Sequence, residues 1–430
     1  MVAVATTLAA QPSPGRASNA SGAPRTAGSA TPLPSVDPLH TAGKNATISL
    51  LTMGNGEQVY ELFGHSAIWI HDDASGRDTV FNWGIFDSRQ PNFILHFLKG
   101  LMLYQMGGET LNEVLYDYRY FNRTVISQQL NLTAAQKDSL LHLIQRNALP
   151  ENRQYRYDYF RDNCSTRPRD LLDQVLGGLV HAHSSQITDR SYRWHALRLM
   201  QVDRPLVVGV DIGLGEPSDN HVTRWDEMFL PRELHDVLNT LRVPDSAGVL
   251  RPLVTSDRVL FQSTRSAEDQ APPNLAPWLT AIGLATAACF AWIGLSVRSG
   301  RRRARIAAAA LYGLWSLVCG LLGVVLTILW LATDHVFAHR NEDLLLFNPV
   351  WLALAVLLPV YFLSGRAARA SRGAAVIVAS LSILALVLHA VMLSSQQNLA
   401  VIGLALPSTL VMAWVVVRTE RGAQRDGSES

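Results

Sequence analysis

The sequence has few charged residues and very few cysteines. Asp, Glu, Lys and Arg make up only 17% of the chain, whereas hydrophobic residues make up 48%. The formal net charge is +2, so composition gives no support for binding to nucleic acid. The chain has no P-loop, dinucleotide fingerprint or paired Cys–His zinc spacing, and we expect no cofactor and no metal. A length of 430 residues predicts two domains.

Charge is missing altogether from five long apolar runs in the C-terminal part. They contain no Asp, Glu, Lys or Arg and cover residues 275–297, 306–333, 349–364, 374–394 and 399–417. A helix needs about 20 apolar residues to cross a hydrocarbon core of about 30 Å. The third run is short, but it can be extended backwards through Leu344–Phe347. Buried core helices are the alternative, yet five such runs in succession favour an all-α bundle of five transmembrane helices at 275–418.

The charges between these runs predict the orientation. The first and third loops and the tail carry Arg298, Arg301, Arg302, Arg303, Arg305, Arg366, Arg369, Arg372, Arg418, Arg421 and Arg425. The second loop has one Arg340 against three acidic residues, and the fourth has no charge. Basic loops stay in the cytoplasm. We therefore expect a multi-pass protein of the bacterial inner membrane, with the tail 419–430 in the cytoplasm and residues 1–274 outside.

The soluble part is expected at 46–265, between two segments of different composition. Residues 1–45 begin with a short apolar stretch without a positive n-region, and then become rich in Ser, Ala, Gly, Pro and Thr. They are predicted to be signal-like and disordered. Residues 266–274 are predicted to be a linker. Within the soluble part, strands are predicted at 46–53, 66–72 and 80–87, a helix followed by a strand at 91–106, and helices at 132–149 and 165–176.

Cys164 is the single thiol of this soluble part, because Cys289 and Cys319 fall within the apolar runs. It therefore has no disulfide partner there, although an extracytoplasmic compartment favours disulfides. Such a thiol is inert, joined to another chain, or reactive. Its neighbours Arg161 to Arg167 are mostly polar, and it stands at the start of the helix 165–176. A helix N-terminus and nearby arginines lower a thiol pKa, so we expect an activated nucleophile.

The general base for such a thiol should be a histidine, and the soluble part offers nine. They are His65, His71, His96, His142, His181, His183, His195, His221 and His235. His65 is the best candidate, because it follows Gly64 at the start of an apolar strand, where a side chain can be held at a cleft edge. His71 lies on the same strand face and is a second possibility. His181 and His183 form a pair without a second ligand cluster, which argues against a metal site.

Several motifs, in order, resemble one family. They are FGHSAIWIHD (63–72), VFNWGIFD (80–87), PNFILHFLKG (91–100), QLNLT (129–133), 147–173 around Cys164, DIGLGEPSDN (211–220) and TDHVFAHRNEDLLLFNP (333–349). Together with the five apolar runs, they resemble the Bacteroides-type lipoprotein N-acyltransferases (Lnb). The N-terminal segment departs from the pattern, because residues 1–45 carry no family motif.

The resemblance implies a fold and a set of site residues. The soluble domain is expected to be an α+β papain-like fold, circularly permuted as in the lecithin retinol acyltransferase group. In that order the histidine comes first, here His65 as general base, and the cysteine follows, here Cys164 as nucleophile. A third polar residue should hold the imidazole. Asn82, Asp162 and Asn163 are the candidates, which the sequence does not separate.

The resemblance also implies a reaction. Cys164 would take an acyl group from a phospholipid as a thioester, and the amine of a diacylglyceryl-cysteine lipoprotein would accept it. Both partners are membrane-embedded. Asp334, His335 and Asn341, in the loop on the same side of the membrane, are expected to line the site mouth. The alternatives are a periplasmic cysteine peptidase or amidase with the same dyad, and a non-catalytic membrane-anchored binding protein.

Overall fold

The computed structural model describes residues 42–86 and 91–425, with side chains as far as residue 418. The predicted signal-like segment therefore lies almost wholly outside the described residues. The chain divides into two compact units. The sheet unit runs to His195 and resumes at His221–Gln270, and the helix unit comprises Ala196–Asn220 and everything from Ala271. Ala196–Asn220 thus groups with the long apolar helices, although it falls within the stretch 46–265.

The sheet unit is built on a seven-stranded antiparallel sheet with the order β11-β5-β1-β2-β3-β4-β6. The strands are β1 (Ala46–Met53), β2 (His65–Asp72), β3 (Arg77–Ile85), β4 (Leu103–Glu109), β5 (Val125–Leu130), β6 (Gln154–Arg156) and β11 (Val254–Phe261). The three strands predicted at the start of the soluble part are confirmed. A short 3-10 turn, η1 (Gly43–Asn45), precedes them.

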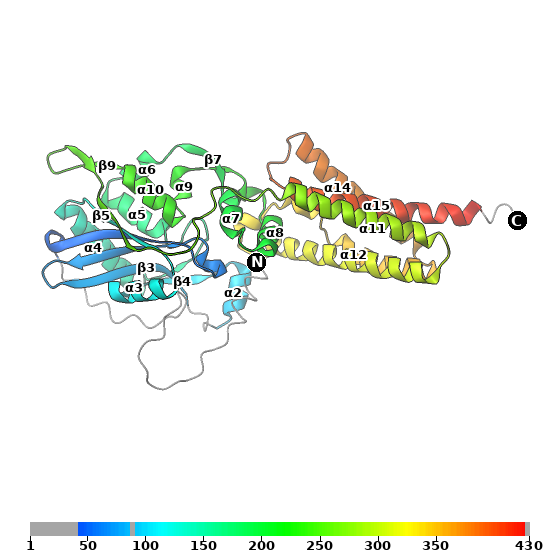
Figure 1. The fold of residues 1–430 in the computed structure, drawn as a ribbon, viewed down its shortest axis with the longest axis horizontal. Helices are drawn as coiled ribbons and strands as arrows, with labels where there is room; N and C mark the ends of the chain where they lie inside the picture. The colour runs from blue at the N-terminus through cyan, green and yellow to red at the C-terminus, as the bar shows by residue number, and fades with distance from the viewer. Residues whose placement is uncertain (1–41, 87–90, 426–430) are drawn as a thin grey trace, which may run out of the picture. The chain divides into compact units, whose positions relative to one another are not determined.

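Helices cover both faces of this sheet (Figure 1). One face packs against α4 (Ala134–Ala148), α5 (Thr166–Val175) and α10 (Pro231–Thr240), and the other against α3 (Leu111–Tyr120). Alternation along the strands supplies both cores, since successive side chains point to opposite faces. On β1, for example, Leu50 belongs to the first core and Leu51 to the second.

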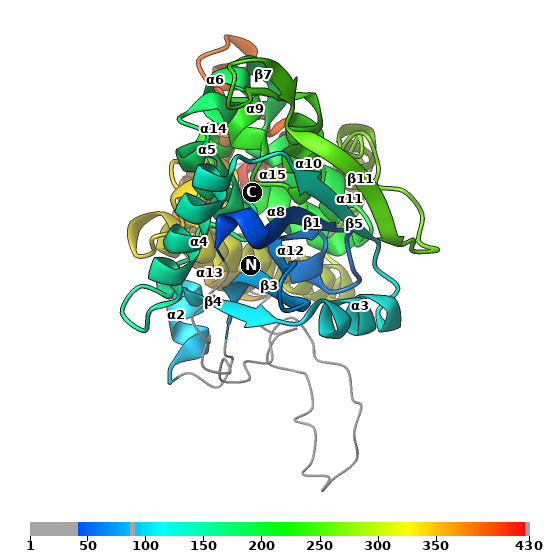
Figure 2. The same cartoon turned by 90° about the vertical axis from the view of Figure 1, so that its left-hand side faces the viewer.

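The helices of the sheet unit begin where their capping residues stand. Thr133 accepts a hydrogen bond from the Gln136 N–H and caps α4, as predicted. The helix and the strand predicted at 91–106 are α2 (Phe93–Lys99) and β4, which lie beside each other (Figure 2). Helix α7 (Tyr192–Met200) runs from the sheet unit into the helix unit. The remaining described elements of the sheet unit are η2 (Val59–Glu61), α6 (Leu179–His183), β7 (Ile187–Ser191), β8 (His221–Thr223), α9 (Arg224–Glu227), β9 (Arg242–Pro244) and β10 (Leu250–Pro252).

The described residues of the helix unit include five helices that are long and apolar enough to cross a membrane. They are α11 (Ala276–Val297), α12 (Arg302–Leu331), α13 (Val350–Ser364), α14 (Ala368–Ala390) and α15 (Leu399–Arg425). The third span gains its length from the turn η5 (Glu342–Leu345), so the span covers Glu342–Ser364. Small residues permit close packing, because a Cβ at Gly283 of α11 would collide with the backbone of Gly403 on α15. The unit also holds α8 (Arg204–Gly213), η3 (Glu216–Ser218) and η4 (Val336–Ala338).

Candidate functional site

Strand register brings three polar side chains together on the face that α3 covers. Ala67 pairs with Asn82, so His65, two residues earlier on β2, is a diagonal neighbour of Asn82 on the same face. Asn82 in turn pairs with Gly107, which makes Glu109 its diagonal neighbour on β4. His65 Nε2 lies 3.0 Å from Asn82 Oδ1, and Asn82 Nδ2 donates to Glu109 Oε1 at 2.7 Å. Period-two alternation thus produces a His–Asn–Glu row.

The row determines which imidazole nitrogen carries the proton. The Glu109 carboxylate accepts hydrogen bonds, so the NH₂ group of Asn82 must face it. The amide oxygen of Asn82 then faces His65 and accepts from Nε2–H. The remaining nitrogen, Nδ1, is left unprotonated in the neutral ring and can act as a base. Glu109 was not among the predicted residues, because its place in the row depends on the strand register.

Cys164 stands just before the N-cap residue of α5, close to the start of β2 and the end of β3. The backbone N–H of Ser66, the residue after His65, donates toward the sulfur and favours the thiolate, as does the N–H of Cys164 itself. Ser66 Oγ also lies 3.5 Å from Ser165 Oγ. Gly84 on β3 has φ +90°, and a Cβ there would lie 3.4 Å from the Cys164 Cβ. The predicted nucleophile and base therefore come from adjoining strand and helix starts.

The expectation of an acidic thiol is wrong. Burial raises the pKa of Cys164 to about 11, and this outweighs the two backbone donors and the attraction of Arg123, which lower it. Burial likewise lowers the pKa of His65 to about 4, against the hydrogen bond that His65 donates to Asn82, which raises it. Both residues keep part of their surface accessible. The Cys164 thiol and the His65 imidazole are consequently both uncharged at neutral pH.

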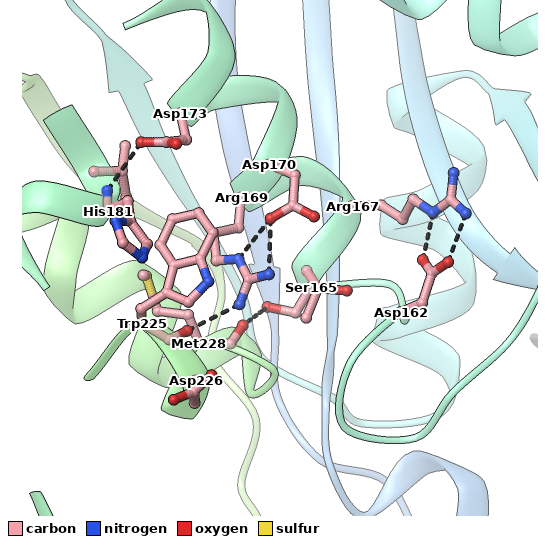
Figure 3. Close-up of polar contacts among 12 residues, drawn as sticks. Asp162, Ser165, Arg167, Arg169, Asp170, Asp173, His181, Trp225, Asp226 and Met228 are labelled. Atoms are coloured by element: carbon pink, nitrogen blue, oxygen red, sulfur yellow. Dashed lines mark hydrogen bonds and ion pairs between the residues drawn. The ribbon is translucent and has the colours of Figure 1, made fainter. Parts of the chain in front are cut away.

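The features expected to acidify the thiol are occupied by other groups. The first amides of α5, from Ser165 and Thr166, donate to Asn163 Oδ1 at 2.8 and 2.9 Å, so the helix N-terminus is already capped. Arg167 forms a two-pronged ion pair with Asp162 at 2.5 and 2.7 Å, as Figure 3 shows. Its guanidinium also stacks on the Tyr155 ring, 3.9 Å from the centroid. Neither the helix nor this arginine is therefore aimed at the sulfur.

The three candidates for the third residue are consequently separated by geometry. Asn82 is hydrogen-bonded to His65. Asp162 binds Arg167. Asn163 is buried, and besides capping α5 it donates to the carbonyls of Tyr159 and Phe229 at 2.9 and 3.0 Å. Asn163 thus holds the loop that carries the thiol.

A buried cation lies near the pair. Arg123 is 4% exposed, and its Nη1 lies 3.1 Å from Glu61 Oε1. Its positive charge lowers the pKa of both His65 and Cys164, because it favours the thiolate and opposes the imidazolium. Sequence reasoning missed Arg123, since a single arginine between a helix and a strand gives no signal of burial. Gly84 did give a signal in the sequence, because an isolated glycine within a strand often marks a place where another segment approaches the strand closely.

The loop residues expected at the site mouth belong to the helix unit. Asn341 is buried, and its Nδ2 donates to the carbonyls of Ile212 and Leu214 at 2.8 and 3.3 Å. Its amide oxygen accepts from the Asp343 N–H. His335 is also buried, whereas Asp334 is exposed. Asn341 therefore fastens the loop to the end of α8.

Comparison with known proteins agrees with the architecture. Residues 40–199 match the family profile described as the Lnb N-terminal periplasmic domain, and residues 271–422 match the Lnb transmembrane domain. Searches of curated proteins and of solved structures gave no match. Within 42–86 and 91–425, no group of three or more His, Cys, Asp or Glu side chains is arranged to hold a metal ion. The two matches, in order and together covering most of the chain, show that this protein belongs to the Lnb family of lipoprotein N-acyltransferases, with a periplasmic domain and a five-helix membrane domain.

Proposed function

We propose that the chain is a membrane-anchored thiol acyltransferase. It moves a fatty acyl group from a phospholipid, through a thioester on Cys164, to the N-terminal amine of a diacylglyceryl-cysteine lipoprotein. The observation that carries the proposal is the approach of Cys164 to the start of β2, where His65 is held by Asn82. Family membership supports the substrates.

The order and type of the three groups favour a permuted papain-like site. Papain-like enzymes use Cys, His and Asn in related roles. Here the histidine and asparagine come from neighbouring antiparallel strands and the cysteine from a helix start. We assign Cys164 as nucleophile, His65 as general base and Asn82 as the residue that orients the imidazole. Asp162 and Asn163, which bind other groups, are assigned to holding the cysteine loop.

In the first half-reaction the neutral pair reacts as substrate binds. His65 Nδ1 takes the thiol proton while the sulfur attacks the ester carbonyl carbon. The backbone N–H groups of Ser66 and Cys164, which favour negative charge on the sulfur, are the candidate donors to the oxyanion. The tetrahedral intermediate then breaks its bond to the glycerol oxygen. The imidazolium protonates that oxygen and lysophospholipid is released. The acyl group remains on Cys164 as a thioester.

The second half-reaction runs through the same groups. The lipoprotein amine attacks the thioester carbonyl, and His65 accepts the proton that the amine loses. The C–S bond breaks, and the sulfur leaves as a thiolate that takes the proton back. The products are the amide and the free Cys164 thiol. Water in place of the amine would give hydrolysis, which is the chemistry of the cysteine peptidase alternative.

The periplasmic loop of the helix unit is included as a substrate-binding element. We propose that Asp334 and His335 contact the polar part of a lipid substrate. Asn341 supports them by fastening the loop to the carbonyls at the end of α8. Replacement of Asp334 and His335 by alanine without loss of acyl transfer would remove the two residues from the proposal.

The test is the mass of a reporter lipoprotein. Cells without their own N-acyltransferase express the wild-type chain, Cys164→Ala, or the matched control Cys289→Ala, in which the thiol lost lies in a membrane helix. We expect the wild type and Cys289→Ala to add one fatty acyl group to the N-terminal amine, and Cys164→Ala to add none. Release of free fatty acid without transfer would instead support a hydrolase. Acyl transfer by Cys164→Ala would show that the reaction needs no thioester on Cys164, and would overturn that step of the proposal.

A further inference from the structure

Helix α2 and the residues that follow it expose a patch of apolar side chains. Ile94, Leu95, Leu98, Leu101 and Leu103, called here the α2 surface, are between 38% and 49% exposed. The first three share the outer side of a seven-residue helix, because they follow the i, i+1, i+4 spacing. Scattered exposed leucines are ordinary, but five large apolar side chains exposed within ten residues are a local concentration.

A row of aromatic rings begins at Phe93 of α2 and ends at Tyr157, beside Cys164. Stacked rings form a row with centroid distances of 5.7 Å from Phe93 to Phe86, 5.2 Å from Phe86 to Tyr104 and 4.2 Å from Tyr104 to Tyr157. Tyr157 reaches the site, since its Cε2 lies 3.8 Å from where a Cβ at Gly84 would stand, beside Cys164. Burial raises the pKa of both tyrosines, so the row stays uncharged. An uncharged aromatic row suits an acyl chain better than a peptide.

The charge around the α2 surface suits a phospholipid. Residues 91–106 contain no Asp or Glu, whereas they include His96 and Lys99. Lys99 is one cation here, and Arg156 is a second beside the helix end, because its Nη2 donates to the Gly100 carbonyl at 3.3 Å. An apolar side bordered by cations is the pattern of elements that lie in an anionic membrane interface.

A bilayer is also the one large apolar phase that is always available to this domain. The sheet unit ends at Gln270, and the first membrane helix begins at Ala276. We propose that the α2 surface inserts among the acyl chains of the periplasmic leaflet, and that the aromatic row conducts a phospholipid acyl group from there to Cys164. The second half of this statement rests on the proposed function. The first half does not.

Insertion is tested in the full chain, reconstituted in a bilayer of phosphatidylethanolamine and phosphatidylglycerol. The three native cysteines are replaced by alanine, and a nitroxide is attached at Leu95→Cys or Leu98→Cys. Oxygen, which concentrates in the bilayer, and a water-soluble nickel chelate report the surroundings of each label. Leu321→Cys, on an exposed position of membrane helix α12, is the lipid-facing reference, and Ser139→Cys, on the exposed side of α4, is the aqueous reference.

We expect labels at positions 95 and 98 to give oxygen-to-nickel ratios severalfold above that of position 139 and close to that of position 321. A ratio equal to that of position 139 would show a water-exposed patch and overturn the proposal. Low accessibility to both reagents would show that protein covers the patch, and this would overturn it as well.

The link to the thiol is tested separately by Leu95→Ser combined with Leu98→Ser. We expect at least a severalfold loss of acyl transfer from bilayer phospholipid, with an unchanged rate of Cys164 alkylation by iodoacetamide, because neither leucine belongs to the site. Full transfer by this variant would overturn the acyl path. If the wild type transfers no acyl group at all, the proposed function fails, and the label accessibilities still decide whether the α2 surface meets lipid.

Discussion

Glu109 is linked to the proposed base His65 through Asn82. Its carboxylate accepts from the Asn82 amide at 2.7 Å, and this leaves the amide oxygen for His65. If Asn82 turned over, its NH₂ group would face Nε2 and favour a proton on Nδ1 instead. The nitrogen needed as the base would then be blocked. Residues of this supporting kind are commonly worth about 10–100-fold in activity.

We therefore predict that Glu109→Ala lowers kcat for acyl transfer by about tenfold or more, whereas Glu109→Gln keeps most of the activity. Glutamine still offers an oxygen to the Asn82 amide, and alanine does not. Rates with a purified reporter lipopeptide measure the difference. Equal losses in the two variants would mean that the negative charge, and not the orientation of Asn82, is what the site needs.

The protonation of Cys164 makes a prediction about its reactivity. With a pKa of about 11, the thiolate is roughly one part in ten thousand at pH 7. Alkylation by iodoacetamide should be slow at neutral pH and should accelerate about tenfold per pH unit up to about pH 10. Parallel labelling of Cys164→Ala subtracts the contribution of the two membrane cysteines. A fast rate that is constant from pH 5 upward would instead indicate a resting thiolate–imidazolium pair.

Gly84 and Gly76 form a matched pair for testing the space around the thiol. Both have positive φ, +90° and +69°, but a Cβ at Gly76 would meet nothing within 4 Å. Alanine at either position costs about 1–2 kcal/mol of backbone strain. Gly84→Ala also places a methyl group against Cys164 and Tyr157, so we predict that it lowers kcat strongly, whereas Gly76→Ala costs stability alone. Similar kinetics for both variants would show that the contact with Cys164 is unimportant.

The start of α5 is the element that presents Cys164, the proposed nucleophile, and Asn163 holds this start in place. Its side chain joins the first amides of the helix to the carbonyls of Tyr159 and Phe229. We predict that Asn163→Ala lowers the free energy of unfolding by about 2–4 kcal/mol, because a cap is lost and buried carbonyls lose donors. Asn163→Asp keeps the acceptor but places a buried carboxylate oxygen against the two carbonyls, so it should lose at least as much. Thermal unfolding of the detergent-solubilised chain, followed by tryptophan fluorescence, measures both losses.

Elements of this molecule were predictable from sequence where local chemistry decides them. Thr133 marks the start of α4, and Gly177–Gly178 marks the end of α5. The strands follow from alternation. Properties that depend on contacts between elements were not predictable. The pKa of Cys164 is the clearest case, because the helix start that should lower it is capped by Asn163 and the thiol is enclosed by distant segments.

At the scale of the whole molecule, the arginine-rich loops predict the direction in which the chain crosses the membrane. With five spans and a periplasmic N-terminal domain, the C-terminus should lie in the cytoplasm. A green fluorescent protein joined to the C-terminus should therefore fluoresce, and alkaline phosphatase at the same place should be inactive. The reverse result would require an even number of spans, and would exclude one of the five helices as a crossing.

The grouping of Ala196–Asn220 with the membrane helices is the whole-molecule feature that sequence patterns missed. Ala196–Asn220 has the mixed composition of a soluble segment, so its association with the membrane helices leaves no mark in hydropathy. The association rests on Ile212, which packs into the core of the membrane helices, and on hydrogen bonds between the segments. These bonds include the Asn341 amide on the Ile212 carbonyl and the Gly215 N–H on the Phe337 carbonyl at 2.7 Å. Such pairings become visible only when the chain is folded.

The protonated state of Cys164 has a consequence for the lifetime of the protein. Peroxides and disulfides react with thiolates, and the periplasm is kept oxidising. A thiol held neutral by its surroundings reacts slowly with both, and the two other cysteines lie in membrane helices, away from it in sequence. In the proposed mechanism Cys164 is activated only when an acyl ester is bound, and between reactions its neutral thiol can thus remain reduced for long periods.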